Sequence, residues 1–182
     1  MFFCIFTLAA VALFPGPFAP TDNWISDLGT PLMNPAGDVY FNSGCIITGA
    51  CMLLLMAGLS AWYTEGGRKK AFMMAGQLCG VISAFGLMLV GVFNESSAYH
   101  DTISTIFFLF LCLFLIFTTI SLWKHLKFIR WIGYYALVVV IIELAFMYTY
   151  FAYDHAPFWE WLAVFSALLW VALLAFNTLY LQ

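Results

Sequence analysis

Charged residues are scarce in this chain of 182 residues: only 8% are Asp, Glu, Lys or Arg. A soluble domain carries roughly 25% charged residues, so the composition excludes an ordinary water-facing surface. The six Lys and Arg residues form no long basic tract, and the net charge is −3. Nucleic acid is therefore not an expected partner.

Cysteine motifs are also missing. The chain has five cysteines, all within apolar runs, and none of them forms a C-x-x-C pair. Small apolar packing residues are the simplest interpretation, and the cysteines indicate nothing about redox compartment. The five are Cys4, Cys45, Cys51, Cys79 and Cys112.

Apolar sequence, by contrast, is abundant: 65% of residues are hydrophobic and 20% are aromatic, with a mean hydropathy of +1.00. A membrane-spanning helix needs about 20 mostly apolar residues, and helices satisfy their own backbone groups in lipid. The chain is therefore predicted to be an all-α, polytopic membrane helix bundle, one transmembrane domain over 1–182 with membrane lipids as partners. The six predicted spans are about 1–14, 41–63, 71–93, 102–123, 131–152 and 158–181.

The first predicted span is short and ends before Pro15. A signal peptide competes with it, but the segment lacks a basic start and an A-x-A cleavage site. We therefore favour a first transmembrane helix that is short or N-terminally incomplete. The connection that follows it, 15–40, is the one long loop between predicted spans.

The basic residues all lie in or beside the connections 64–70 and 124–130. The positive-inside rule places these two connections, and with them both chain termini, in the cytoplasm. The connections 15–40, 94–101 and 153–157 then lie outside. They hold seven of the nine acidic residues or lie beside them: Asp22, Asp27, Asp38, Glu95, Asp101, Asp154 and Glu160. The expected location is the cell membrane.

The outer side also carries two of the three histidines, which suggests a metal site. Imidazole and carboxylate ligands together suit zinc, and an open position would activate water. The ligands would be His100, His155 and one of Asp27, Asp101 or Asp154. No H-x-x-x-H or H-E-x-x-H spacing supports the site, and the cofactor stays unknown.

Two other interpretations of these outer residues stay open. In a hydrolase, Ser26 or Ser104 would be the nucleophile and His100 the base. Alternatively, the polar residues only cap helices at the water boundary, as Asp101 does in sequence before a span. A pocket for a lipid headgroup or other ligand is the remaining option.

Glu143 lies near the middle of the fifth predicted span. An ionisable residue at that depth is a functional candidate by default, and the hypotheses are a ligand or proton site in a small transporter and a neutral link between helices. No Lys or Arg lies at its depth, so it is expected to be protonated. Ser83, Thr48 and Trp170 are the expected hydrogen-bond partners.

Two spans carry packing signals. Gly76, Gly80 and Ala84 recur every fourth residue, a pattern typical of close helix contact, and we expect this face to support a homo-oligomer. The fourth span carries large residues all round, including Phe107 and Phe114, and is expected to face lipid widely.

Several short motifs resemble one family. They are the stretch from Asn23 to Gly29 (N-W-I-S-D-L-G), Asn34-Pro35, the stretch 41–44 (F-N-S-G), and the stretch from Gly91 to His100. The chain resembles the uncharacterised prokaryotic six-helix membrane proteins grouped as domain of unknown function 998, in which a Glu begins the last span and a Trp follows, here Glu160 and Trp170. More distantly it is similar to the Frag–DRAM–Sfk family, which is linked to GPI-anchor remodelling, autophagy and phosphoinositide control.

The resemblance implies no established reaction, but it implies that four residues form one outer site: Ser26, Asp27, His100 and Glu160. The 15–40 connection is expected to fold over the bundle to bring them together. The predicted function is lipid or amphiphile binding at this site, with an intramembrane hydrolase or lipid-remodelling enzyme as the alternative. The candidate ligand-binding residues are Asn23, Asn94, Glu95, Asp154 and Glu143.

Overall fold

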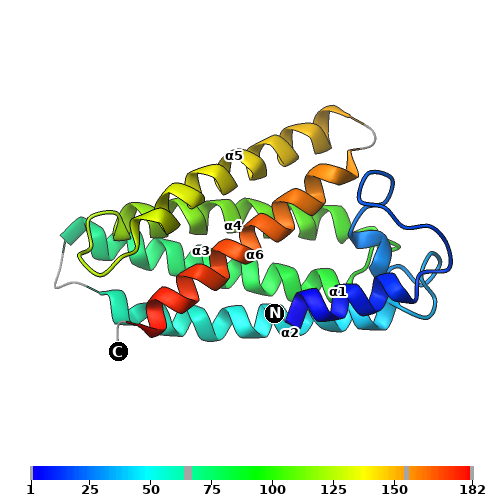
Figure 1. Ribbon diagram of the computed structural model, residues 1–182, viewed down its shortest axis with the longest axis horizontal. Coiled ribbons are helices and arrows are strands. Elements are labelled where there is room, and N and C mark those ends of the chain that lie inside the picture. Colours follow the sequence, from blue (N-terminus) through cyan, green and yellow to red (C-terminus); the bar gives the residue numbers. More distant parts are fainter. Residues whose placement is uncertain (1, 64–66, 154–155, 181–182) are drawn as a thin grey trace.

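The computed structural model describes residues 2–63, 67–153 and 156–180. Within these residues all regular structure is helical, and five long helices run side by side (Figure 1). Each of the five is long and apolar enough to cross a membrane, which confirms an all-α, multi-pass membrane bundle. They are α2 (Asp38–Gly58), α3 (Gly67–Val92), α4 (His100–Leu122), α5 (Arg130–Ala152) and α6 (Pro157–Leu179).

The sixth helix, α1 (Phe2–Ala12), has 11 residues. At about 1.5 Å per residue it is roughly 16 Å long, about half of the ~30 Å hydrocarbon core. It lies along α2, over one half of the bundle's length (Figure 1). The predicted first helix therefore exists, but its described part is shorter than a membrane crossing.

Two short 3₁₀ turns complete the regular structure: η1 (Ser26–Gly29) and η2 (Leu59–Trp62), which extends α2. The helix ends follow the predicted spans closely, except that α3 begins four residues earlier than the predicted start at 71. Gly67 opens α3 with φ of 80°, a left-handed conformation that favours glycine. The basic residues after it belong to the first turn because a helix can extend beyond the apolar segment that predicts it.

The small-residue face of α3 packs inside the chain. Gly76, Gly80 and Ala84 are all buried. A Cβ at Gly76 would lie 2.6 Å from the Thr118 hydroxyl of α4, and one at Gly80 would collide with Met56 of α2. The absence of side chains lets the three helices approach closely. A homo-oligomer through this face stays a prediction and would have to share or replace these contacts.

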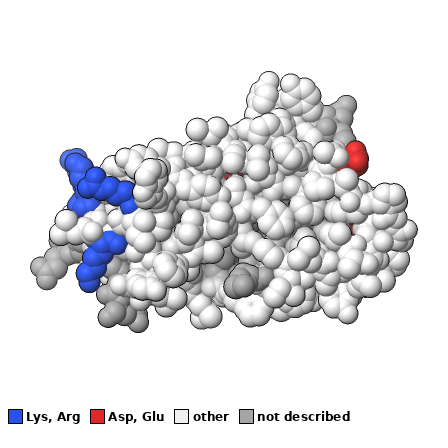
Figure 2. Space-filling view, in the orientation of Figure 1, with Lys and Arg blue, Asp and Glu red and all other residues white. Residues whose placement is uncertain are grey.

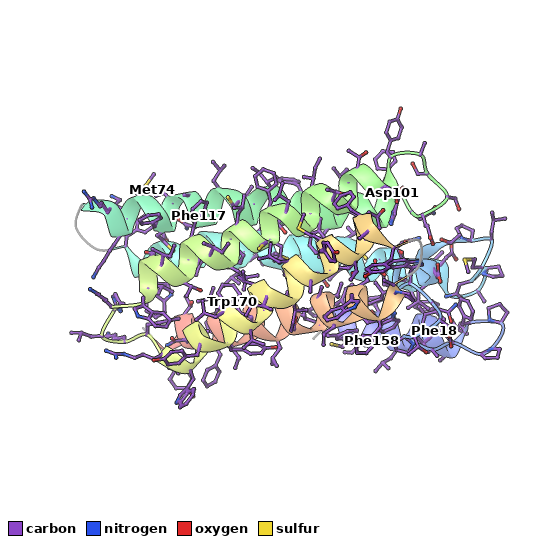
Figure 3. The ribbon with its side chains drawn as sticks, turned by 90° about the horizontal axis from the view of Figure 1, so that it is seen from above. Phe18, Met74, Asp101, Phe117, Phe158 and Trp170 are labelled. Carbon is purple, nitrogen blue, oxygen red and sulfur yellow. The ribbon has the colours of Figure 1, made fainter. Side chains whose placement is uncertain are left out.

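The expectation that the fourth span faces lipid widely was wrong. Phe107, Phe108 and Phe114 of α4 are buried, and the Phe114 ring packs edge-on against Trp170 of α6 at 5.3 Å between centroids. Trp170 lies in the middle of the bundle (Figure 3). The glycines of α3 draw α4 inward, and α5 instead has the smallest buried share of the spans.

The two ends of the bundle differ in charge (Figure 2). We call one the acidic end: it holds η1, residues 93–99, and the first turns of α4 and α6. The other, the basic end, holds the first turn of α3, residues 123–129 and the last turn of α6. Asp101 and Met74 mark opposite ends in Figure 3. Which end faces the cytoplasm stays a prediction.

Candidate functional site

The first connection folds back over the acidic end and is fastened to α6. The backbone N–H of Ile25 donates a 2.7 Å hydrogen bond to the Glu160 carboxyl, and the Trp161 indole N–H donates to the Asn23 carbonyl at 2.9 Å. Ile25 and Leu28 are buried, at 3% and 0% exposure. The fold thus brings Ser26 and Asp27 to the start of α6, as expected from the sequence.

Much of the I-S-D-L-G stretch has a local structural role. The Asp27 carboxylate accepts the Trp24 N–H at 2.9 Å, which stabilises the start of η1. A side chain at Gly29 would collide with Asn42, whose amide donates to the Gly29 carbonyl at 2.9 Å. Ser26 has a different surrounding, because it lines two cavities at this end.

His100 and Ser104 form a hydrogen-bonded pair one helical turn apart on α4. The His100 Nδ1 lies 2.9 Å from the Phe93 carbonyl oxygen, which can only accept, so Nδ1 carries the proton. In the neutral ring Nε2 is then an acceptor for the Ser104 hydroxyl at 3.3 Å. This is the tautomer that a base needs to take a proton from a serine.

Two carboxyl groups from different connections interact beside this pair. Glu95 shares a hydrogen bond with Asp27 and accepts one from the Thr30 hydroxyl at 3.3 Å. Burial, and then the hydrogen bond and negative charge of Asp27, raise the pKa of Glu95 to about 7. Glu95 therefore titrates near neutral pH.

A polar cavity of about 240 Å³ opens between α4, α5, α6 and η1. Three carboxyl residues line it (Glu95, Asp101 and Glu160), and no Lys or Arg does so in the described part of the chain. Aromatic side chains form much of the remaining wall: Trp24, Phe108, Phe146, Tyr150 and Phe151.

An apolar cavity of about 220 Å³ adjoins the polar one and extends along α2, α4 and α6. Its wall is almost wholly hydrocarbon and sulfur, for example Met52 and Leu168, and its polar groups lie mainly at one end. The two cavities share five lining residues: Ser26, His100, Ser104, Phe108 and Glu160. A molecule that fills both would place an apolar part and a polar part on either side of these residues.

Four other residues predicted for the site are not part of either cavity wall as the structure describes it. Asn23 and Asn94 line neither cavity, because their side chains bond to their own connections: Asn23 to the Ala19 N–H and Asn94 to the Ser96 N–H. Asp154 and His155 lie outside the described residues. The metal site that includes His155 therefore stays a prediction, and the described His, Cys, Asp and Glu side chains include no group of three close enough to hold a metal ion.

Glu143 lies apart from this cluster, fully buried on α5 with 0% exposure. Neither of its carboxyl oxygens has a hydrogen-bond partner among the described residues. The expected partners point elsewhere: Trp170 donates to the Ile132 carbonyl and Ser83 to the Phe107 carbonyl. That part of the Glu143 prediction was wrong.

The aromatic wall of the polar cavity was not predicted. Tyr150, whose hydroxyl bonds to Asp101, is the clearest omission. A sequence signal for it exists, since the buried Phe146 and the half-buried Tyr150 follow Glu143 at helical spacing on α5. Aromatic residues are so frequent here that this spacing did not stand out.

Comparison with known proteins yields one match. Residues 1–177 match the family described as "Protein of unknown function (DUF998)". No curated protein and no solved structure matches the chain. The more distant likeness to the Frag–DRAM–Sfk family stays a prediction. Because the match covers nearly the whole chain, this multi-pass membrane protein belongs to the DUF998 family.

Proposed function

We propose that the protein binds a membrane amphiphile at its acidic end. The observation that carries the proposal is the pair of adjoining cavities, one apolar and one polar, that share Ser26, His100 and Glu160. The apolar chain of the ligand lies in the first cavity and its headgroup in the second.

The headgroup decides which amphiphile binds. The chain of the ligand comes from a bilayer that is already apolar, so its transfer into an apolar cavity gains little hydrophobic free energy. Polar contacts, by comparison, differ strongly between headgroups, because an unpaired buried charge is costly. Selectivity therefore depends on the polar cavity.

The polar cavity favours an amine or ammonium headgroup. Glu95, Asp101 and Glu160 line it, and Asp27 lies beside Glu95. A phosphate there would meet like charges and, in the described part of the chain, no Lys or Arg to pair with it, whereas an ammonium would pair with a carboxylate. The faces of aromatic rings such as Trp24 and Tyr150 attract the same kind of cation.

A cross-linking experiment tests occupancy of the apolar cavity. A single-chain alkyl amine with a photoreactive group in its chain is irradiated with the protein in nanodiscs, and the modified peptides are identified by mass spectrometry. We expect labels on α2, α4 and α6 at the cavity wall. Ala172→Phe places a larger side chain at that wall and should reduce them, whereas Leu169→Phe, a lipid-facing position on the same helix, should not. Equal labelling in both variants would contradict the proposal.

The orientation of the site is part of the proposal. The six basic residues gather at the basic end, and the positive-inside rule would place that end in the cytoplasm. The headgroup cavity then opens toward the outer leaflet. Labelling of single cysteines introduced at Asp22 and Lys124, in intact cells, tests this, with reaction expected only at position 22.

Hydrolysis of the bound amphiphile is a second candidate, favoured by the Ser104–His100 pair. The Ser104 oxygen would attack an acyl carbon while its proton passes to His100 Nε2, which then protonates the leaving group. A lipid-soluble alkyl fluorophosphonate tests the pair by forming an adduct on an activated serine. The adduct should appear on Ser104 and be lost in His100→Gln. An adduct on no serine, or one that persists in His100→Gln, would argue for binding without catalysis.

A further inference from the structure

Glu143 poses a problem that the amphiphile site does not solve. Its carboxyl group is completely buried, and both oxygens lack a hydrogen-bond partner among the described residues. Buried polar groups in proteins are nearly always hydrogen-bonded, because leaving one unpaired costs free energy. A carboxyl group in these surroundings points to a role that needs its proton.

Among the described residues, the surroundings of Glu143 offer no counter-charge. At its own depth, the titratable group that faces it is the Cys112 thiol of α4. The charged and titratable groups at the acidic end of the packed helices are His100 and Asp101 on α4 and Glu160 on α6, and Tyr150 lies two turns away on α5 itself. At the other end of α5 lies Arg130. An ionised Glu143 would therefore be an unpaired buried charge.

A short route connects Glu143 to the polar cavity. Phe146 follows Glu143 on the same buried stripe of α5, and residues three apart on a helix are neighbours. Phe146 lines the polar cavity and packs against Phe108 of α4, with 4.6 Å between ring centroids. The Phe108–Phe146 pair thus forms part of the cavity wall about one helical turn from the buried carboxyl.

We propose that Glu143 is a proton-binding site that exchanges its proton with the polar cavity when the Phe108–Phe146 pair parts. A rotation of one ring opens the path, and closure of the pair returns the carboxyl to its apolar surroundings. The site gives the protein a means of responding to pH in the membrane interior, and it does not depend on amphiphile binding.

Dicyclohexylcarbodiimide, an apolar reagent for protonated carboxyl groups, tests the proposal. The carboxyl proton moves to a carbodiimide nitrogen and the carboxylate oxygen bonds to the central carbon; the product rearranges to a stable N-acylurea with no atom lost. Full-length protein in nanodiscs is labelled at about pH 6 and about pH 9, and the Glu143 peptide is quantified by mass spectrometry. Glu143→Gln identifies the labelled residue.

We expect Glu143 to be labelled, and labelling to fall by about fivefold or more at the higher pH, because a site in exchange with water loses its proton there. Phe146→Leu should speed labelling at the lower pH by several-fold, and Phe146→Ala should speed it further. Phe114→Ala is the matched control: it removes a buried ring of α4 outside the polar cavity and should leave the rate unchanged. Should Phe146→Ala fail to fold, the Phe146→Leu comparison still decides the question.

Three results would overturn the proposal. Labelling that is equal at both pH values would show a permanently neutral group. No labelling even in the Phe146 variants would show that the carboxyl is unreachable or unprotonated. A rate that responds to pH but is the same in wild type and both Phe146 variants would show that the Phe108–Phe146 pair does not control access.

Discussion

At each end of α6 a side-chain oxygen accepts a hydrogen bond from a backbone N–H of a neighbouring connection, but the surroundings of the two contacts differ. At the acidic end the Glu160 carboxyl accepts the Ile25 N–H at 2.7 Å, and at the basic end the Asn177 amide oxygen accepts the Ile129 N–H at 3.0 Å. Each contact fastens a connection to the last helix. Glu160, however, lines both cavities, whereas Asn177 lines neither.

The neighbours of the two contacts show the same difference. At the basic end, Asn177 also donates to the Lys127 carbonyl and the Ser121 hydroxyl donates to the Lys69 carbonyl. At this end the polar side chains are used in hydrogen bonds to backbone groups. At the acidic end, Ser26 and Glu160 are buried but line the two cavities. Two buried side chains that each bind a backbone N–H therefore need not have the same role: Glu160 lines the cavities and is part of the candidate site, whereas Asn177 is not.

The largest effect is expected from substituting the two side chains of α6 that bind a connection, Glu160 and Asn177. Glu160→Ala and Asn177→Ala each remove the acceptor of at least one backbone N–H, so each should lower the free energy of unfolding by about 1–3 kcal/mol. Only Glu160→Ala should also weaken binding of an alkyl amine, by about tenfold or more, since it removes a carboxyl group from the headgroup cavity. Thermal unfolding and ligand titration in nanodiscs measure the two quantities. Equal losses of binding in both variants would remove the distinction between the ends.

The second prediction concerns the dependence of stability on pH. A titrating residue at the acidic end should lose its stabilising contribution as the pH rises, and one at the basic end should lose it as the pH falls. Because the pKa of Glu95 is raised from 4.5 to about 7, the native state holds this proton more tightly than the unfolded chain does. Its stabilising contribution is full below about pH 4.5 and is lost as the pH rises through about 7. In Glu95→Gln, the thermal unfolding temperature should no longer fall over this interval.

His125 at the basic end provides the comparison. Burial, and then the positive charges of Lys69 and Lys127, lower the pKa of His125 below 6.5. The unfolded chain then takes up this proton first, so the contribution of His125 is present above about pH 6.5 and is lost as the pH falls. In His125→Gln, the free energy of unfolding should fall less as the pH drops below about 6.5. If Glu95→Gln and His125→Gln changed stability over the same pH interval, the environments assigned to the two residues would be wrong.

The smallest effects should come from two hydroxyl groups, one at each end. Thr30→Val removes a 3.3 Å hydrogen bond that lowers the pKa of Glu95, so the Glu95 transition should move to higher pH. Ser121→Ala removes the 2.7 Å bond to Lys69 and should change stability alone, by about 1 kcal/mol. Unfolding curves recorded across pH distinguish the two. If Ser121→Ala also moved the pH at which Glu95 titrates, the acidic and basic ends would not be energetically independent.

The fold could largely be predicted because the bilayer imposes it. Apolar run length sets each span, and short connections force antiparallel neighbours, so the long helices lie close to where hydropathy places them. The proximity of Ser26 to Glu160 followed from the family resemblance and from the long first connection. The sequence could not show that backbone N–H groups of Ile25 and Ser26 bind the Glu160 carboxyl, since backbone donors carry no side-chain signal.

The failures share a cause. The spacing of Gly76, Gly80 and Ala84 shows that a helix packs closely, but not on which helix, and the structure uses the face within the chain. Depth along a span likewise suggested Ser83 as a hydrogen-bond partner of Glu143. The direction in which a side chain points also depends on the rotation of its helix about the helix axis, and the Ser83 hydroxyl donates to the Phe107 carbonyl instead. Cavities depend on the same rotations and on side-chain volumes, so the site could be predicted as a set of residues and not as a shape.

The measurement that tests the central claim most directly compares two amphiphiles of equal chain length, an alkyl amine and an alkyl phosphate, bound to the protein in nanodiscs of uncharged lipid. The account predicts that the amine binds more tightly, that Glu160→Ala removes this preference, and that Asn177→Ala keeps it. Tighter binding of the phosphate, or an amine preference that survives Glu160→Ala, would contradict the claim that the carboxyl-lined acidic end is the ligand-binding end.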